Sequence, residues 1–166
     1  MSMAGWYPAG MSAPDKSDVL RAIADRLIGE LAAAERAAAA ASSEVTSAEA
    51  KAESKYDTRS TEASYLARGQ AERVGGLQRS VTWFRSQAEG EGRGAALLEL
   101  IEDKGSRWVM LAPMGGGQRV TVQGVEVVVV TRGSPVGRAL QDVEAGEEAT
   151  WKAGGRVRVV EVEQRF

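Results

Sequence analysis

Apolar residues recur at steps of three or four positions through much of the first half of the chain. The first run consists of Leu20, Ile23, Leu27, Leu31, Ala34, Ala38, Ala41, Val45, Ala48 and Ala52. The second run, which includes one glutamine, consists of Ala63, Ala67, Gln70, Val74, Leu77, Val81 and Phe84. Such spacing places all members of a run on one face of an α-helix, as in a coiled coil. The two runs therefore predict two long helices.

Residues 55–60, between the two runs, interrupt the pattern with turn and cap formers. Two helices joined by a short polar loop pack most simply against each other, and the alanines on the seam let the backbones approach closely. We therefore expect an antiparallel helical hairpin, a coiled coil, over residues 15–89 with its tip near residues 55–62. The alternative is a plain dimerisation coiled coil, which the polar break disfavours.

The composition changes sharply after the second run begins. Residues 15–74 contain 16 Ala and no Pro, whereas residues 75–166 contain 15 of the 19 Gly, and 14 Val follow residue 100. Alanine favours helix and valine favours strand. Short apolar runs bounded by turn formers predict strands at 96–102, 107–111, 119–122, 125–131, 149–152 and 156–163.

Ser134 followed by Pro135 predicts the start of a short helix that covers one face of this sheet, because serine caps helices and proline fits their first turn. The expected fold class is α+β. A Gly-rich linker at residues 90–94 would join the helical hairpin to a small antiparallel sheet domain at residues 95–166.

The chain contains no Cys and no His, which excludes disulfides, thiol or imidazole nucleophiles and most transition-metal sites. Carboxylates are the remaining strong metal ligands. The formal charge of −2 disfavours a protein that coats nucleic acid, so we expect nucleic acid contact only indirectly. Residues 1–14 lack the basic and apolar parts of a signal peptide, and no stretch of about 18 apolar residues occurs. We expect a disordered leader at 1–14, no membrane span and a cytoplasmic location.

The segment 134–166 resembles a known family. It contains, at matching spacing, a Ser-Pro-hydrophobic-Gly-Arg-Ala-Leu helix, a Gly-acidic-acidic turn and a Gly-Gly turn before the last strand. The matching residues are Ser134, Pro135, Arg138, Ala139, Leu140, Gly146, Glu147, Glu148, Gly154 and Gly155. With a helical hairpin placed before the sheet domain, this pattern resembles the bacterial Gre family of transcript-cleavage factors.

The resemblance implies an FKBP-like sheet domain and a monomeric accessory factor of bacterial RNA polymerase, with no active site of its own. The sheet domain would dock on the polymerase, and the hairpin tip would enter the channel that leads to the active site. The resemblance assigns partner contacts to Ser134, Pro135, Val136 and Arg138 in the sheet domain. At the tip it assigns them to Tyr56, Asp57, Arg59 and Ser60.

The family tip reads Gly-Asp-x-x-Glu-Asn-Ala-Glu-Tyr, and its Asp and first Glu hold a magnesium ion in the polymerase active site. Asp57 matches the Asp, but Ser60 stands where the Glu is expected. The resemblance therefore leaves Asp57 and Glu62 as the pair that would share Mg²⁺ with the polymerase, with no cofactor bound stably. The displaced second carboxylate leaves two outcomes open, stimulated cleavage of backtracked RNA or inhibition by occupying the channel.

There are two alternatives to this interpretation, one for the tip and one for the whole chain. Asp57 or Thr58 is simply the N-cap of the second helix, with Glu62 favourable near the positive helix end. At the level of the whole chain, the alternative is a structural coiled-coil interaction module whose sheet domain binds a peptide. An independent hydrolase is disfavoured because the chain offers only carboxylates for catalysis.

Overall fold

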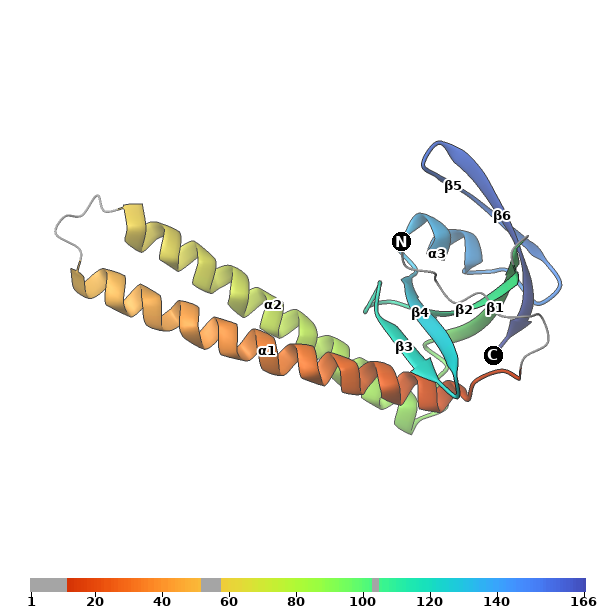
Figure 1. Cartoon of the computed structure of the whole chain (residues 1–166), viewed down its shortest axis with the longest axis horizontal. Coiled ribbons are helices and arrows are strands. Elements are labelled where there is room, and N and C mark those ends of the chain that lie inside the picture. The colour runs from red at the N-terminus through yellow and green to blue at the C-terminus, as the bar shows by residue number, and fades with distance from the viewer. Residues whose placement is uncertain (1–11, 52–57, 103–104) are drawn as a thin grey trace. The chain divides into compact units, whose positions relative to one another are not determined.

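The structure is a computed structural model that describes residues 12–51, 58–102 and 105–166 (Figure 1). Of residues 48–51 and 58–59 it describes the backbone only. The described residues form three helices, which are α1 (Lys16–Lys51), α2 (Thr58–Glu89) and α3 (Pro135–Leu140). The strands are β1 (Ala96–Glu102), β2 (Gly105–Ala112), β3 (Arg119–Val122), β4 (Val125–Thr131), β5 (Glu148–Ala153) and β6 (Arg156–Arg165). The predicted class, α+β with a helical hairpin before a small sheet and a short helix, is confirmed.

The chain divides into two compact units, and the division falls inside the two long helices. One unit is Ala24–Thr82, and the other joins the described residues up to Ile23 with Trp83–Phe166. We call these the hairpin unit and the sheet unit. None of the described helices is both long enough and apolar enough to cross a membrane. Of the predicted leader, residues 1–11 lie outside the described residues, and Pro14 is buried.

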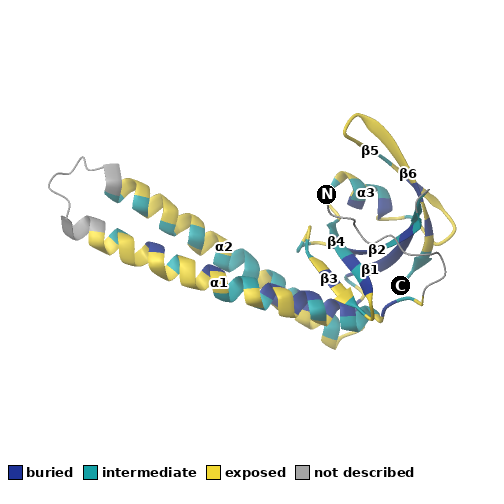
Figure 2. Ribbon diagram, viewed as in Figure 1, coloured by how far each residue is buried: buried dark blue, intermediate teal, exposed yellow. Residues whose placement is uncertain are grey.

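In α1 and α2, the predicted apolar seam is the face that is removed from water. All seam positions with described side chains are buried or half-buried, whereas most positions between them are exposed (Figure 2). Ala34 and Ala41 are buried although they carry only a methyl group. Such small side chains contribute little apolar area, but they allow close helix packing. The predicted antiparallel helical hairpin is therefore confirmed.

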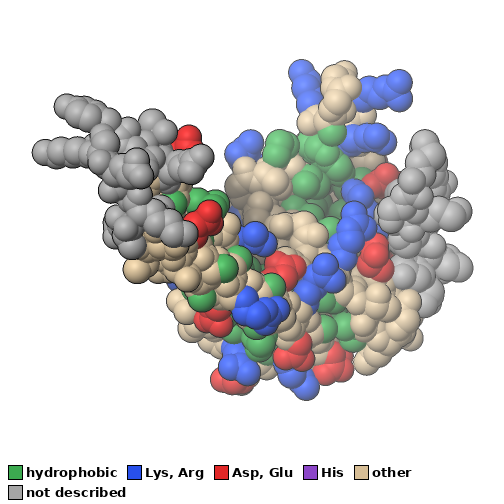
Figure 3. Space-filling model, turned by 60° about the vertical axis from the view of Figure 1, so that its left-hand side comes forward, with side chains coloured by type: hydrophobic (Ala, Val, Ile, Leu, Met, Phe, Trp, Pro, Cys, Tyr) green, Lys and Arg blue, Asp and Glu red, His purple; other side chains and the backbone are tan. Residues whose placement is uncertain are grey.

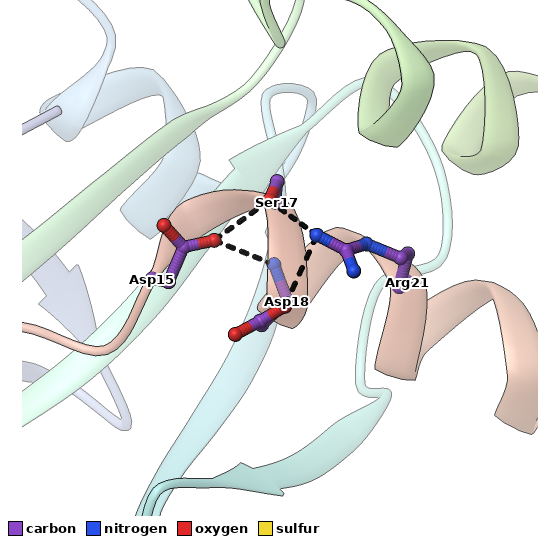
Figure 4. Close-up of polar contacts among 4 residues, drawn as sticks. All are labelled: Asp15, Ser17, Asp18 and Arg21. Atoms are coloured by element: carbon purple, nitrogen blue, oxygen red, sulfur yellow. Dashed lines mark hydrogen bonds and ion pairs between the residues drawn. The ribbon is translucent and has the colours of Figure 1, made fainter.

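A local network of side chains fixes the start of α1 (Figure 4). A carboxylate oxygen of Asp15 accepts hydrogen bonds from the Asp18 N–H at 2.9 Å and from the Ser17 hydroxyl at 2.7 Å. The first N–H groups of a helix have no partner within the helix, so the Asp18 contact is an N-cap. Arg21 closes the network through Ser17 Oγ at 2.7 Å and Asp18 Oδ1 at 3.1 Å. The Ser17 hydroxyl, and then the Asp18 N–H, lower the pKa of Asp15.

The strands of the sheet unit form a sheet in the order β3-β4-β2-β1-β6-β5 among the described residues. The prediction of an antiparallel sheet is wrong for one pair, because β2 and β4 run parallel, with Trp108 opposite Val127. The cause is topological. After β2 the chain skips one strand position to form β3 and then turns back, so β4 fills the skipped position after two reversals. The other four pairs are antiparallel.

Both faces of the central strands are covered. One face packs with α3 in a core of Leu98, Leu100, Val109, Leu111, Leu140, Ala149, Val160 and Val162. The alternate residues Leu97, Trp108 and Met110 point to the other face and are also fully buried. On the helix side of this unit, Phe84 of α2 is fully buried and lies against Gly115.

Residues 90–94, predicted as a linker, form a turn that is tied to the end of α2. The Gly94 N–H donates to Gln87 Oε1 at 2.8 Å, and the Ala95 N–H donates to the Gly92 carbonyl at 3.1 Å. Gly92 has a φ of +63°, which glycine adopts without the steric cost of a Cβ. The turn therefore delivers the chain directly from α2 to β1.

Candidate functional site

The start of α3 is built by the first residues of the Ser-Pro motif. Ser134 is extended, and its Oγ accepts a hydrogen bond from the Gly137 N–H at 3.0 Å while donating to the Thr131 carbonyl at 2.7 Å. Pro135 occupies the first helical position, where its missing N–H leaves no intrahelical bond unmade. The predicted cap is thus confirmed, and it anchors the helix to the end of β4.

The small residue in the middle of the motif allows α3 to lie close to the chain after β4. A Cβ at position 137 would overlap the Thr131 carbonyl oxygen and would lie 2.7 Å from the Thr131 carbonyl carbon and 3.0 Å from Arg132 Cα. These are backbone atoms, which cannot rotate away. Leu140 is fully buried, and Val136 and Ala139 pack against the same core.

The end of α3 is held by Arg165, a residue that sequence analysis missed. Its guanidinium donates to the carbonyls of Leu140 at 3.1 Å, Val143 at 2.8 Å and Gln141 at 2.9 Å. A cation that satisfies carbonyls at a helix C-terminus stabilises that end.

Lys16 Nζ donates to the main-chain oxygen of Phe166 at 3.1 Å. Burial, followed by the charge of Arg165, lowers the pKa of Lys16.

The structure separates the predicted contact residues of α3 into supporting and accessible ones. Ser134 and Val136 are half-buried, and Ser134 is engaged in the cap. Pro135 and Arg138 are exposed, and Arg138 Nη1 donates to the Gly133 carbonyl at 2.7 Å. This bond restricts the guanidinium without burying it. Pro135 and Arg138 are therefore the exposed ones among these four side chains, on a helix fixed at both ends.

The predicted tip residues are only partly within the described residues. Tyr56 and Asp57 lie outside them, and the side chain of Arg59 is not described. Helix α2 begins at Thr58, so Ser60 lies in its first turn, where its carbonyl accepts a hydrogen bond from Ser64 Oγ at 2.8 Å. Glu62 is exposed. The pairing of Asp57 with Glu62 around Mg²⁺ stays a prediction.

Two exposed apolar side chains follow Glu62 on the same helix. Tyr65 is 72% exposed and Leu66 is 52% exposed. Tyr65 lies on the side of α2 opposite the seam formed by Ala63 and Ala67, because successive residues turn by about 100°. The sequence pattern shows only that Tyr65 is not part of the seam. It does not predict that this large aromatic side chain is exposed.

A buried carboxylate, also missed from sequence, lies in the sheet. Glu99 is fully buried opposite Trp108 of β2, and Gln164 Nε2 donates to Glu99 Oε2 at 2.8 Å. Within the described ranges, no group of three or more His, Cys, Asp or Glu side chains could hold a metal ion. A single carboxylate beside an amide offers neither a metal site nor an acid–base pair, so the exposed surface of α3 and the start of α2 are the better candidates.

No protein-family model and no curated protein matches the chain. Among solved structures, the chain is similar to GreA factor homolog 1 (Gfh1) of Thermus thermophilus, with 15% identity, a TM-score of 0.37 and coverage of 88% of this chain and 96% of that chain. A structure of the transcription factor Gfh1 gives 16% identity, a TM-score of 0.36 and coverage of 86% and 92%. Gfh1 of Thermus aquaticus gives 15%, 0.34, 87% and 94%.

Proposed function

We propose that the protein is a transcription elongation factor that binds bacterial RNA polymerase, docks through its sheet unit and inserts the tip of its helical hairpin into the channel leading to the active site. The observation that carries this proposal is the build of α3. Ser134 caps one end and Arg165 the other, so that Pro135 and Arg138 are presented on a rigid, exposed surface. Rigid presentation reduces the entropy lost on binding.

The protein supplies no catalytic centre of its own in this proposal. Hydrolysis of a phosphodiester by two metal ions needs hard oxygen ligands around magnesium. Asp57 and Glu62 would contribute carboxylate oxygens to an ion that belongs to the polymerase. With Ser60 at the position where the Gre pattern has its glutamate, the strength with which these carboxylates hold the ion decides between cleavage and simple occupation of the channel.

Binding of the full-length chain to purified bacterial RNA polymerase core tests the docking part. We expect Arg138→Glu to weaken binding by about tenfold or more, because an exposed arginine at an interface centre carries a large share of the binding energy. The matched control is Arg93→Glu, a charge reversal at an exposed arginine that pairs with Glu91 in the same unit. Absence of wild-type binding, together with concentration-dependent self-association, would favour the coiled-coil interaction module instead.

Transcript cleavage on a stalled, backtracked elongation complex tests the tip. If Asp57 and Glu62 share the ion, Asp57→Asn and Glu62→Gln abolish cleavage and leave polymerase binding nearly unchanged, since an amide keeps the shape and loses the charge. If wild type yields no shortened transcripts but slows elongation, the protein acts by occupying the channel. Activity that survives both amide substitutions would contradict the shared-ion role.

A further inference from the structure

The turn end of the β5–β6 hairpin is a cationic segment in a chain of net negative charge. Residues 149–160 contain Lys152, Arg156 and Arg158 and no Asp or Glu, whereas the whole chain has a formal charge of −2. All three side chains are exposed, and no carboxylate in the described part of the chain forms an ion pair with them. Figure 3 shows Lys and Arg side chains gathered at this upper end, without acidic ones among them.

Two exposed aliphatic side chains share one face of the hairpin with Lys152. Val157 is 59% exposed and Val159 is 52% exposed. Val157 is opposite Lys152 and Val159 is opposite Thr150 in the antiparallel register, so these four side chains share one face of the hairpin. On this face two neighbouring exposed valines lie beside one exposed lysine, so a small apolar patch adjoins a cation, whereas Arg156 and Arg158 belong to the opposite face.

The opposite face of the β5–β6 hairpin packs, through Trp151, against the core that includes α3. Trp151 is opposite Arg158 and packs against the core that Val136 and Ala139 also contact. The Arg158 and Arg156 side chains extend this face beyond the tryptophan, where β5 and β6 continue past α3 (Figure 1). The cationic end therefore lies in the same unit as the exposed residues Pro135 and Arg138 of α3.

The position of β5 in the sheet offers another explanation for Lys152. It is an edge strand of the described sheet, paired only with β6. Lysine on an edge strand commonly serves to prevent unwanted strand pairing, which would account for Lys152. That function does not account for Arg156 and Arg158 on the neighbouring strand, nor for two exposed valines, which weaken such protection.

We infer that the β5–β6 end, defined by Lys152 and residues 156–159, is a second docking surface that binds an acidic polypeptide segment of the polymerase. This inference rests on the proposed function and names a further contact for it. A polypeptide fits better than nucleic acid for two reasons. Three cations neutralise few phosphates, and binding of single strands relies on exposed aromatic platforms, whereas the exposed apolar groups here are valines.

The test compares full-length variants for binding to purified bacterial RNA polymerase core between about 50 and 300 mM KCl. The hairpin variant is Lys152→Gln/Arg156→Gln/Arg158→Gln, and a second variant, Val157→Thr/Val159→Thr, removes apolar surface while keeping strand propensity. The matched control, Arg85→Gln/Arg93→Gln/Arg119→Gln, neutralises three exposed arginines of the sheet unit that lie outside the β5–β6 end. We expect about tenfold weaker binding and a shallower salt dependence for the hairpin variant, threefold or more weakening for the valine variant, and near-wild-type binding for the control.

The outcomes separate the inference from the proposed function. If wild type binds polymerase, and the hairpin variant and the valine variant both bind as tightly as wild type, the inference of a second docking surface is wrong and the proposed function stands. If wild type does not bind polymerase, both are wrong. If the hairpin variant loses affinity for a fluorescent 20-nucleotide single strand while binding polymerase normally, the ligand is nucleic acid and the inference is overturned. Near-native circular dichroism of each variant is required before binding is compared.

Discussion

Replacing Gly137 by alanine should destabilise the sheet unit, although alanine is the better helix former. The added Cβ would overlap the Thr131 carbonyl oxygen and lie within 2.7 Å of its carbonyl carbon, so α3 must move by about 1 Å. That movement disturbs the hydrogen bond from the Gly137 N–H to Ser134 Oγ. Overpacking costs about 1–3 kcal/mol and a weakened N-cap about 1 kcal/mol, while helix propensity returns up to about 1 kcal/mol. We expect a net loss of about 1–3 kcal/mol in the free energy of unfolding.

Urea unfolding followed by tryptophan fluorescence measures this change, because Trp108 and Trp151 both lie in the sheet unit. The matched control is Gly69→Ala in α2, where a Cβ would meet nothing within 4 Å. The control should stabilise the hairpin unit by about 0.5–1 kcal/mol, measured by circular dichroism at 222 nm. A Gly137→Ala protein as stable as wild type, with unchanged polymerase binding, would refute the close packing of α3.

Three further changes have expected outcomes. Asp15→Ala should cost about 0.5–2 kcal/mol at neutral pH, whereas Asp15→Asn should cost little, because both Asp and Asn cap helices well. The pKa of Asp15 is lowered in the folded state, so its ionic contribution is present above the ordinary value of 3.8 and is lost as pH falls through the lowered value; urea midpoints between pH 2 and 7 measure this. Arg165→Met should cost about 1–3 kcal/mol and weaken polymerase binding, since three carbonyls near the end of α3 lose their donor; an unchanged affinity would show that α3 does not need this support. Leu27→Ala should cost about 2–5 kcal/mol in thermal unfolding, because Leu27 is buried, whereas Leu66→Ala at an exposed position should stay within about 0.5 kcal/mol.

Elements with a strong local period were predictable from the sequence. The helical seam follows from steps of three and four, and the strand limits 119–122 and 125–131 agree with the structure, because Gln123-Gly124 turns the chain between them. The cap at Ser134 followed from the residue types alone. In each case the determining interactions lie within a few residues along the chain.

The parts that could not be predicted depend on long-range pairing. The parallel pair of β2 and β4 arises from a skipped strand position, which leaves no local mark. Arg165 reaches α3 because the register between β1 and β6 shifts between Glu99 and Leu100, which places Arg165 opposite Leu98. Simple alternation from the buried Val160 and Val162 would instead place Gln164, not Arg165, on the α3 side.

Crosslinking from the hairpin tip tests the central claim most directly. A benzoylphenylalanine introduced in place of Glu62 in the full-length chain would be irradiated with purified bacterial RNA polymerase in a stalled elongation complex, and the adducts mapped by mass spectrometry. The same crosslinker in place of Arg138 reports on docking through α3. Insertion of the tip predicts adducts from position 62 on polymerase segments next to the catalytic magnesium, and adducts from position 138 on the outer rim of the channel. Adducts from position 138 alone, with none from position 62 inside the channel, would contradict the account.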